Sequence, residues 1–389
     1  MGHGKGGHFR SLVSTAEAMQ HCNHTVNIFS IGFAKSPVIN SSSCSVKNFL
    51  ISFFNIPFIL FKVVYNAKKV NPDILHAFDD PSFAFARIAA LILKKKAILT
   101  KCGGPSPSGY FPLAPQLTLF SQEDFSFFTR TPRFHHTDIH LISARTRPIS
   151  EQKQDLIEEI RQQCNLKKDS ILFLRIARLN KKYFPGFQQI AHLIQTLRAQ
   201  GIKCCCVLIG VIEDTVIREM LTQYEQEGIF QIYTDEEYTE QGSQFLSLAD
   251  CVIASGRGVM EASSLGRPVM CPTNNTEFPV MMLPDTFGTL FMYNFSERAT
   301  FANKNEVDSQ SIKTLSNEIE RNKASNYSKT MFAQHFNVDK AVSKYEKVYD
   351  STINQTKAMY MDTLFHIVRV HLLYGKQMIK KVLIFFKVM

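Results

Sequence analysis

A glycine-containing turn at residues 255–262, with the sequence SGRGVMEA, joins an apolar run to an amphipathic run. The order strand, glycine-containing turn, helix points backbone N–H groups at a phosphate. Gly256 and Gly258 let a ligand approach the backbone closely. Glu261 lies about one turn into the expected helix, where its carboxylate can accept hydrogen bonds from ribose hydroxyls. Such turns also occur for structural reasons alone, so this one is by itself a weak sign of a nucleotide site.

A second group of residues, whose side chains could bind a charged ligand, follows the apolar run at residues 171–174. It consists of Arg175, Arg178, Lys181 and Lys182. Cations at the carboxyl end of a parallel strand lie where doubly wound sheets bind ligands, and Arg and Lys suit phosphate oxygens. A solvated basic loop is the simpler interpretation of this group alone. Together with a carboxylate at the same edge of the same expected sheet, it favours a phosphate site.

Two α/β domains are expected to position these residues. A chain of 389 residues exceeds what one core usually supports. Strand-like and helix-like segments alternate, which is typical of α/β domains with parallel sheets. A second series of strand-like and helix-like segments starts after about residue 150. We therefore expect domains at residues 1–150 and 151–345 and a helical tail at 346–389. Two such units in tandem leave a cleft, which is a common place for a ligand.

The expected elements follow hydrophobic periodicity and turn residues. In the first domain we expect helices at residues 10–20, 48–69 and 82–93 and strands at 25–31, 73–78, 97–101, 117–121 and 140–143. In the second we expect strands at residues 171–176, 203–209, 229–233, 251–254 and 268–271 and helices at 150–163, 187–200, 214–227, 244–248 and 258–265.

The first domain has an unusual start. A doubly wound domain usually opens with a strand that feeds a glycine-rich loop. Here the glycine-rich loop at residues 2–7 comes first. Either the domain lacks its first strand or its start lies upstream of Met1, and we favour the second interpretation.

The amino-acid composition limits the classes of partner and of site that we expect for this protein. The net charge of +10 favours an anionic partner, although a basic surface without a particular partner remains an alternative.

The cysteines and apolar stretches exclude other classes of site. The chain has nine cysteines, an odd number, of which three are consecutive at residues 204–206, and it has no Cys-x-x-Cys pair. We therefore expect neither a disulfide framework nor a zinc site. No signal peptide is expected. The apolar stretch at residues 49–65 is interrupted by polar residues, which favours an interfacial helix over a membrane span.

Residues 171–272 resemble the donor domain of glycosyltransferase family 4. The match rests on the sequence ADCVI at residues 249–253, followed by EASSLGRPV at 261–269. The resemblance implies the GT-B fold, α/β with two Rossmann-like doubly wound domains facing a cleft. It also implies that Glu261 holds the ribose of a nucleotide-sugar and that Arg178 and Lys182 act on the donor diphosphate. Lys181 competes with Lys182, because the spacing after Arg178 is shorter than usual. The other donor-binding residues expected are Gly210, Gly256, Arg257 and Gly258.

The chain departs from the family pattern at one position. Many members carry two glutamates in this motif, the first of which contacts the donor sugar. Here only Glu261 is present, and the sequence GRG at residues 256–258 forms a contracted loop. Backbone amides would replace the missing contact, with Arg257 near phosphate, so the donor sugar stays open.

The first domain resembles the acceptor domain of the family more weakly. Gly6 and Gly7 match its glycine loop near the donor phosphates and the acceptor. The sequence DILHA at residues 73–77 matches a family strand, which implies a catalytic role for His76; a satisfied core histidine is the alternative. Gly103 and Gly104 follow the next strand, where the family has a glycine loop on the cleft.

The resemblance implies a retaining glycosyltransferase that moves a sugar from a nucleotide-sugar to a glycan or lipid-linked acceptor, in bacterial surface polysaccharide synthesis in the cytoplasm. Cations and helix N-termini would stabilise the leaving diphosphate, so we expect no cofactor, no metal and no nucleic-acid partner. No Asp-x-Asp motif is present, and Asp79-Asp80 is expected to be a loop or helix cap. Two alternatives stay open: a sugar-nucleotide epimerase on the same fold, and a non-catalytic nucleotide-sugar or glycan-binding protein.

The tail at residues 361–389 is basic and amphipathic. It is expected either to pack back across both domains as a final helix or to dock on the inner face of a membrane with anionic lipids. The segment at residues 49–69 could supply a second membrane contact.

Overall fold

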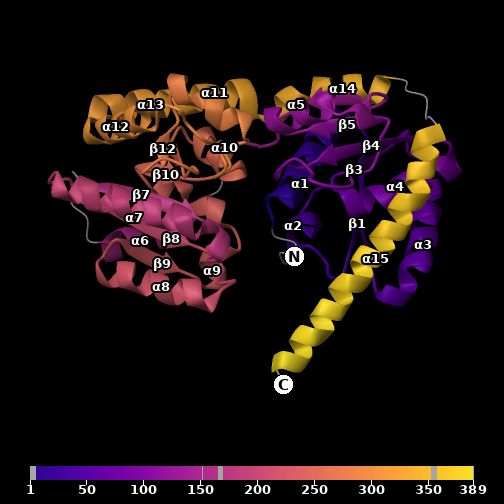
Figure 1. Cartoon of the computed structure of the whole chain (residues 1–389), viewed down its shortest axis with the longest axis horizontal. Coiled ribbons are helices and arrows are strands. Elements are labelled where there is room, and N and C mark those ends of the chain that lie inside the picture. Colours follow the sequence, from indigo (N-terminus) through magenta and orange to yellow (C-terminus); the bar gives the residue numbers. More distant parts are fainter. Residues whose placement is uncertain (1–5, 151, 165–169, 352–356, 389) are drawn as a thin grey trace. The chain divides into compact units, whose positions relative to one another are not determined.

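The computed structural model describes residues 6–150, 152–164, 170–351 and 357–388, with side chains for all of these except 53, 357–358 and 377–388 (Figure 1). The chain forms two compact units. Unit 1 consists of Met1–Arg145 and Val338–Met389, and unit 2 is Thr146–Asn337. These limits differ from the expected ones: the division lies at residue 145 instead of 150, and residues 338–345 belong to unit 1. The reason is apolar packing, since Val338, Ala341 and Tyr345 share a core with residues of the first domain.

Unit 2 is built on a six-stranded sheet with the order β12-β11-β10-β7-β8-β9. All neighbours are parallel except β12, which runs antiparallel to β11. The strands are β7 (Ile171–Ile176), β8 (Cys204–Ile209), β9 (Phe230–Tyr233), β10 (Cys251–Ile253), β11 (Val269–Cys271) and β12 (Val280–Met281). The five strands expected here are confirmed, and β12 was not foreseen.

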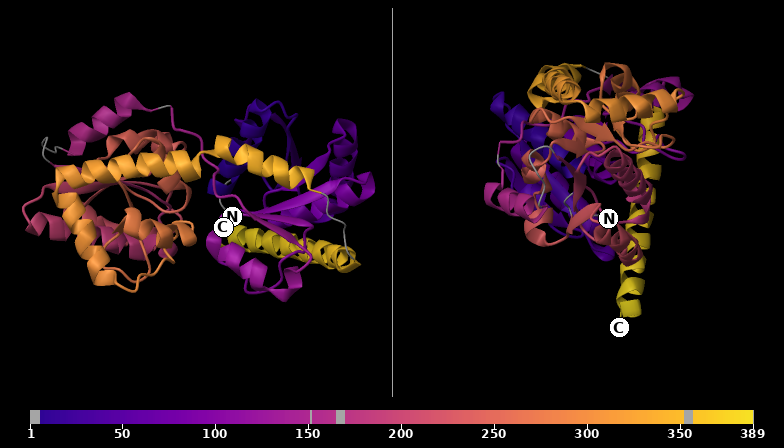
Figure 2. Two further views of the ribbon diagram at one scale, coloured as in Figure 1. Left: turned by 90° about the horizontal axis from the view of Figure 1, so that it is seen from above. Right: turned by 90° about the vertical axis from the view of Figure 1, so that its left-hand side faces the viewer.

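Helices cover both faces of this sheet (Figure 2). Side chains of β7 and β8 alternate between two apolar cores, with Leu172 and Leu174 in one and Ile171 and Phe173 in the other. Burial on both faces explains the nearly continuous apolar runs of these strands. The helices are α6 (Gln154–Cys164), η3 (Lys181–Tyr183), α7 (Phe184–Ala199), α8 (Thr215–Gln226), α9 (Glu236–Thr239), η4 (Gly242–Leu248), α10 (Arg257–Ser264), α11 (Pro284–Met292), α12 (Lys304–Ser316), α13 (Glu318–Met331) and η5 (Phe332–Phe336).

Unit 1 holds two separate parallel sheets, β1-β2 and β3-β4-β5-β6. The strands are β1 (Asn27–Gly32), β2 (Ser45–Leu50), β3 (Ile74–Ala77), β4 (Lys96–Lys101), β5 (Gln116–Leu119) and β6 (Asp138–Leu141). The helices are α1 (Gly7–His21), α2 (Pro37–Asn40), η1 (Phe53–Asn55), α3 (Ile56–Val70), α4 (Asp80–Leu93), α5 (Gln122–Arg130), η2 (Pro132–Phe134), η6 (Val338–Ala341), α14 (Val342–Asp350) and α15 (Lys357–Val388).

The prediction of a helix at residues 48–69 is wrong for the amino-terminal part of that range. Residues 45–50 form β2, which pairs with β1 in register from Asn27↔Ser45 to Gly32↔Leu50. Pro57 lies in the first turn of α3, where its missing N–H costs nothing, and so the helix starts there. The cap expected at residues 79–80 is confirmed, because the Asp79 carboxylate accepts from the Ser82 N–H at 2.7 Å.

The tail helix α15 packs on unit 1 through one face. Its Asp362 forms a buried ion pair with Arg87 at 3.1 Å, and its His366 Nε2 lies 2.6 Å from Asp80 Oδ1. Val370 joins an apolar core with α3 and α4. The expected tail residues from 377 onward lie outside those with described side chains. Among the described residues, no helix is long and apolar enough to span a membrane.

Candidate functional site

The candidate site lies where the strand order of unit 2 reverses. From β7 the sheet grows outward in two directions, first through β8 and β9 and then through β10 and β11. Open α/β sheets bind ligands outside the carboxyl ends of the two strands at such a switch point. Here those strands are β7 and β10, with Arg175 paired opposite Ile253. Both groups of residues singled out in the sequence therefore reach one edge of one sheet.

A buried ion pair crosses this switch point. The Arg175 guanidinium is 1% exposed, and its Nη2 donates to Glu297 Oε1 at 2.6 Å and to Ser255 Oγ at 3.3 Å. Its Nη1 donates to the Ile253 carbonyl at 3.4 Å. Burial raises the pKa of the Glu297 carboxyl, and the charge of Arg175 opposes that rise. Arg175 thus joins the ends of β7 and β10 to the loop after α11, and its guanidinium is already paired with Glu297.

The glycine turn leads into α10 as the sequence predicts. Gly256 has φ of 58° and ψ of −124°, which a residue with a Cβ rarely adopts, and its N–H donates to the Phe295 carbonyl at 2.9 Å. Arg257 Nε donates to Glu261 Oε1 at 2.7 Å, one helical turn along, and both side chains are 12% exposed. A carboxylate has about four acceptor positions, so this bond leaves Glu261 able to accept from ribose hydroxyls.

The basic loop after β7 is held in place by Glu213, which lies in the segment after the neighbouring strand β8. Glu213 Oε1 accepts from Arg178 Nη1 at 3.3 Å, and its Oε2 accepts from Asn180 Nδ2 at 2.7 Å. Lys181 and Lys182 are exposed. The charge of Lys182 lowers the pKa of Glu297, which places Lys182 within electrostatic range of the switch point. The choice between Lys181 and Lys182 as the second cation of the expected pair stays a prediction.

Gly210 and Gly258 have packing reasons to be glycine. A Cβ at position 210 would lie 1.8 Å from the Ala177 carbonyl oxygen, so only glycine lets the segments after β7 and β8 approach each other. A Cβ at position 258 would lie 3.3 Å from the Ala254 side chain. A donor-binding role for these two residues stays a prediction.

In unit 1 the predicted glycines lie at the ends of elements. Gly6 precedes α1 and Gly7 is its first residue. Gly103 and Gly104 follow β4 with φ of 86° and 85°, the left-handed region that favours glycine. The negative charge of Asp79 acts on the pKa of both His8 and Cys102, so the starts of α1 and α4 and the loop after β4 lie near one another.

His76 has partners at both ring nitrogens. Nδ1 lies 3.0 Å from the Tyr349 hydroxyl and Nε2 lies 2.6 Å from Thr100 Oγ1, which is itself hydrogen-bonded to Thr118 Oγ1. Burial lowers the pKa of His76 to about 3. These contacts agree with the core-histidine interpretation, and a catalytic role for His76 stays a prediction.

Sequence reasoning missed Glu297 and Glu213 as parts of the site. Glu297 is 122 residues from Arg175 along the chain, and Glu213 is 35 residues from Arg178. Neither belongs to a recognisable motif. The only available signal was that cations at a strand end need counter-charges, and that signal does not say which acid supplies them.

The fold is shared with proteins of known structure. No family model and no curated protein matches the chain in sequence. The Anabaena protein Alr3699/HepE in complex with UDP and glucose has a TM-score of 0.61 at 15% identity, over 89% of this chain and 96% of that one. A glycosyltransferase from Rickettsia africae has a TM-score of 0.62 at 13% identity, over 88% and 93%.

A Listeria monocytogenes protein that carries the name of a UDP-N-acetylglucosamine 2-epimerase has a TM-score of 0.55 at 13% identity, over 90% of this chain and 96% of that one. At these identities the likeness concerns the fold alone. The neighbours share a two-domain, Rossmann-like architecture, so the GT-B fold predicted from the sequence is confirmed.

Gly210→Ala should destabilise unit 2, because the new methyl group would meet the Ala177 carbonyl. We expect the free energy of unfolding to fall by about 2–3 kcal/mol in urea denaturation. Gly288→Ala is the matched control, since a Cβ at this position in α11 meets nothing within 4 Å and should leave stability unchanged or slightly raised. Equal stability of the two variants would contradict the packing role of Gly210.

The stability of unit 1 should depend on pH through His76. The folded-state pKa is about 3 and the ordinary value is 6.5, so below pH 6.5 the unfolded chain binds a proton that the folded chain does not. Stability is therefore lost as the pH falls, by up to about 1.4 kcal/mol per pH unit. We expect His76→Gln to reduce the stability difference between pH 7 and about pH 5.5 by about 1 kcal/mol in urea denaturation. An unchanged difference would show that His76 is not neutral in the fold.

Proposed function

We propose that the chain is a glycosyltransferase, in which unit 2 binds a nucleotide-sugar donor and unit 1 binds the acceptor. The observation that carries the proposal is the convergence of Glu261, the Gly256 turn and the loop with Arg178 and Lys182 at the switch point of unit 2. A carboxylate suits ribose hydroxyls, and cations with a helix N-terminus suit a diphosphate.

The nucleotide we propose is a uridine diphosphate. HepE was solved with UDP and with UDP-glucose on the same fold. Glu261 would accept hydrogen bonds from the ribose, while Arg178 would exchange Glu213 for the diphosphate. The sugar itself is not assigned by these residues, because the loop at residues 256–258 carries no second glutamate.

The proposed reaction is retaining and needs no metal. The bond between the anomeric carbon and the diphosphate oxygen breaks, the acceptor oxygen bonds to the same face of that carbon, and the acceptor proton passes to the donor phosphate. Arg178 and Lys182 would stabilise the negative charge that develops on the leaving diphosphate. The acceptor class we propose is a glycan or lipid-linked glycan of surface polysaccharide synthesis.

UDP binding tests this proposal. We expect wild-type protein to bind UDP in calorimetric titration and Glu261→Ala to weaken binding by about 1.5–3 kcal/mol, the energy of one charge-assisted hydrogen bond. Glu219→Ala is the control, since Glu219 is exposed in α8 and outside the site. Absence of binding to UDP and to UDP-, GDP- and ADP-sugars would overturn the proposal, and equal affinities of the two variants would remove Glu261 from the site.

The epimerase alternative keeps some support from the likeness to the Listeria protein. An epimerase and a transferase differ in how they act on a UDP-sugar when no acceptor is present. An epimerase would convert a UDP-sugar without an acceptor, whereas a transferase would at most hydrolyse it slowly. Binding without either reaction would favour the non-catalytic alternative.

We further propose that unit 1 docks on an anionic membrane surface in the cytoplasm. Two helix faces carry exposed apolar side chains. Before and along α3 these are Phe54, Phe58, Phe61 and Tyr65, and along α15 they are Tyr360, Met361, Leu364, Phe365, Val368 and Leu372. The ammonium groups of Lys62 and Lys69 lie over the rings of Phe58 and Tyr65, at 4.3 and 4.6 Å. Apolar rings with adjacent cations suit the headgroup boundary of anionic lipids.

Vesicle flotation tests the docking. We expect wild-type protein to float with phosphatidylglycerol vesicles more than with phosphatidylcholine vesicles. The double variant Phe58→Ser, Phe61→Ser should lose most of that binding, because it removes exposed apolar area without touching the core. Ile319→Ser is the control, because Ile319 lies on unit 2 and is exposed to 66%, about as much as Phe61 at 65%. Equal flotation of the double variant and the control would contradict docking through α3.

A further inference from the structure

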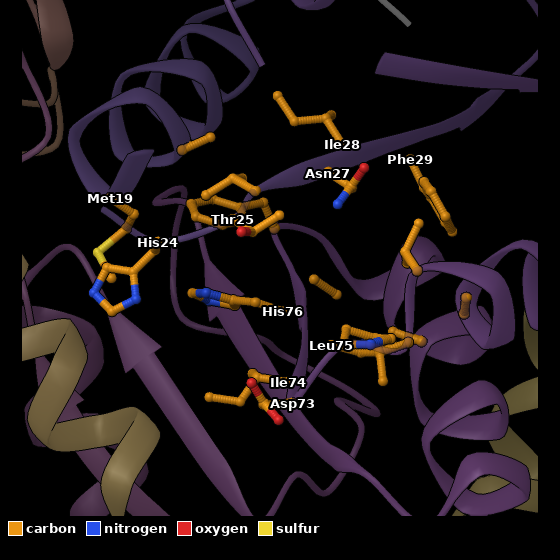
Figure 3. A pocket seen from close by; sticks show the side chains of 18 of the residues that line it. Met19, His24, Thr25, Asn27, Ile28, Phe29, Asp73, Ile74, Leu75 and His76 are labelled. Carbon is orange, nitrogen blue, oxygen red and sulfur yellow. The ribbon is translucent and has the colours of Figure 1, made fainter. Parts of the chain in front are cut away.

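A cavity of about 700 Å³ lies inside unit 1 between its two sheets (Figure 3). Ile28 of β1 and Leu75 of β3 line it, and helices α1, α3 and α4 contribute Met19, Val63 and Phe85. The wall therefore consists of two strands and of the helices that cover the sheets. Figure 3 shows Asn27, Ile28 and Phe29 across the cavity from Ile74, Leu75 and His76.

Both strands that border the cavity have a neighbour on their other side. β1 pairs with β2 over six residues, and β3 pairs with β4 over four. In the part of the chain that the structure describes, β1 and β3 belong to different sheets. Each thus turns an edge towards the cavity, and strand edges carry backbone N–H and C=O groups that need partners when buried.

β1 and β3 start at the same end of the cavity. The turn after α1, residues 23–26, lines it together with residues 71–73, which lead into β3. At the other end His8, in the first turn of α1, is within electrostatic range of Asp79, which follows β3. The two edges therefore run parallel, and α1 starts beside the carboxyl end of β3.

The size of the cavity fits a length of strand. A strand residue rises about 3.3 Å, adjacent strands are about 4.8 Å apart, and a sheet layer is about 10 Å thick, which gives about 160 Å³ per residue. The cavity therefore has room for about four residues or more, the length of β3. Helices close both faces, so such a strand would be buried on both sides and mainly apolar.

We propose that this cavity is the binding place of one further β-strand, an apolar extended segment of about four to six residues whose carboxyl end is joined to α1 by a short connection. It would run parallel to β1 and β3 and join the two sheets into one of seven strands. With α1 and β1 it would form a right-handed βαβ unit, the connection that parallel strands almost always use. Because its carboxyl end would lie at the start of α1, it would also anchor Gly6 and Gly7, a consequence that rests on the proposed function.

A fused strand tests the proposal. A segment of six alternating valines and isoleucines is added directly ahead of Met1 in the full chain, and residues 1–6 serve as the connection to α1. We expect backbone amide exchange in residues 27–32 and 74–77 to slow by about tenfold or more relative to the unextended chain. The matched control carries proline at the second and fourth added positions, which removes two backbone donors.

Two results would overturn the proposal. One is equal amide exchange in the strand fusion and the proline control. The other is slowing that persists in Ala86→Phe, because Ala86 of α4 lines the cavity and a phenyl ring there would fill the space of the strand. Loss of the slowing in that variant supports the proposal. UDP binding is measured in parallel: its failure counts against the proposed function and does not alter the exchange result.

Discussion

The candidate site depends on the buried ion pair between Arg175 and Glu297. A guanidinium that is 1% exposed would cost several kcal/mol if it were unpaired, so the chain must bring Glu297 and the end of β10 to it. That requirement fixes the loop after α11, and the Phe295 carbonyl in this loop accepts the N–H of Gly256. The same contacts therefore position the turn into α10 and, through it, Glu261.

Unit 1 has a different constraint, which is the pairing of strand edges. Four of its strands form one parallel sheet, while β1 and β2 form another, and helices pack over both. The cavity of about 700 Å³ between them is lined by residues of both β1 and β3, the strands that face each other across it.

Much of unit 2 could be predicted from the sequence because its signals are local. β7 and β8 are apolar runs bounded by polar residues, and Gly256 and Glu261 stand in a short motif. The prediction failed where the signal was not local. β2, with the sequence SVKNFL, is half exposed and depends on its pairing with β1, so an apolar stretch just after it made the whole segment resemble a helix. Glu297 and Glu213 could not be found because only the folded chain brings them to their cations.

The charges around the site are balanced within the protein itself. Arg175 is paired with Glu297, Arg178 with Glu213, and Arg257 with Glu261. These pairs differ in burial: the Arg175 side chain is 1% exposed, whereas that of Arg178 is 49% exposed. A diphosphate could therefore take Arg178 from Glu213 at little cost, since exposed ion pairs contribute about 0–1 kcal/mol. It could not take Arg175 from Glu297 as easily, because the Arg175 guanidinium is buried beneath the partly exposed carboxyl and is not free to move. The difference in burial gives Arg175 a structural role, and in the proposed function the diphosphate is therefore bound by the exposed cations of the following loop.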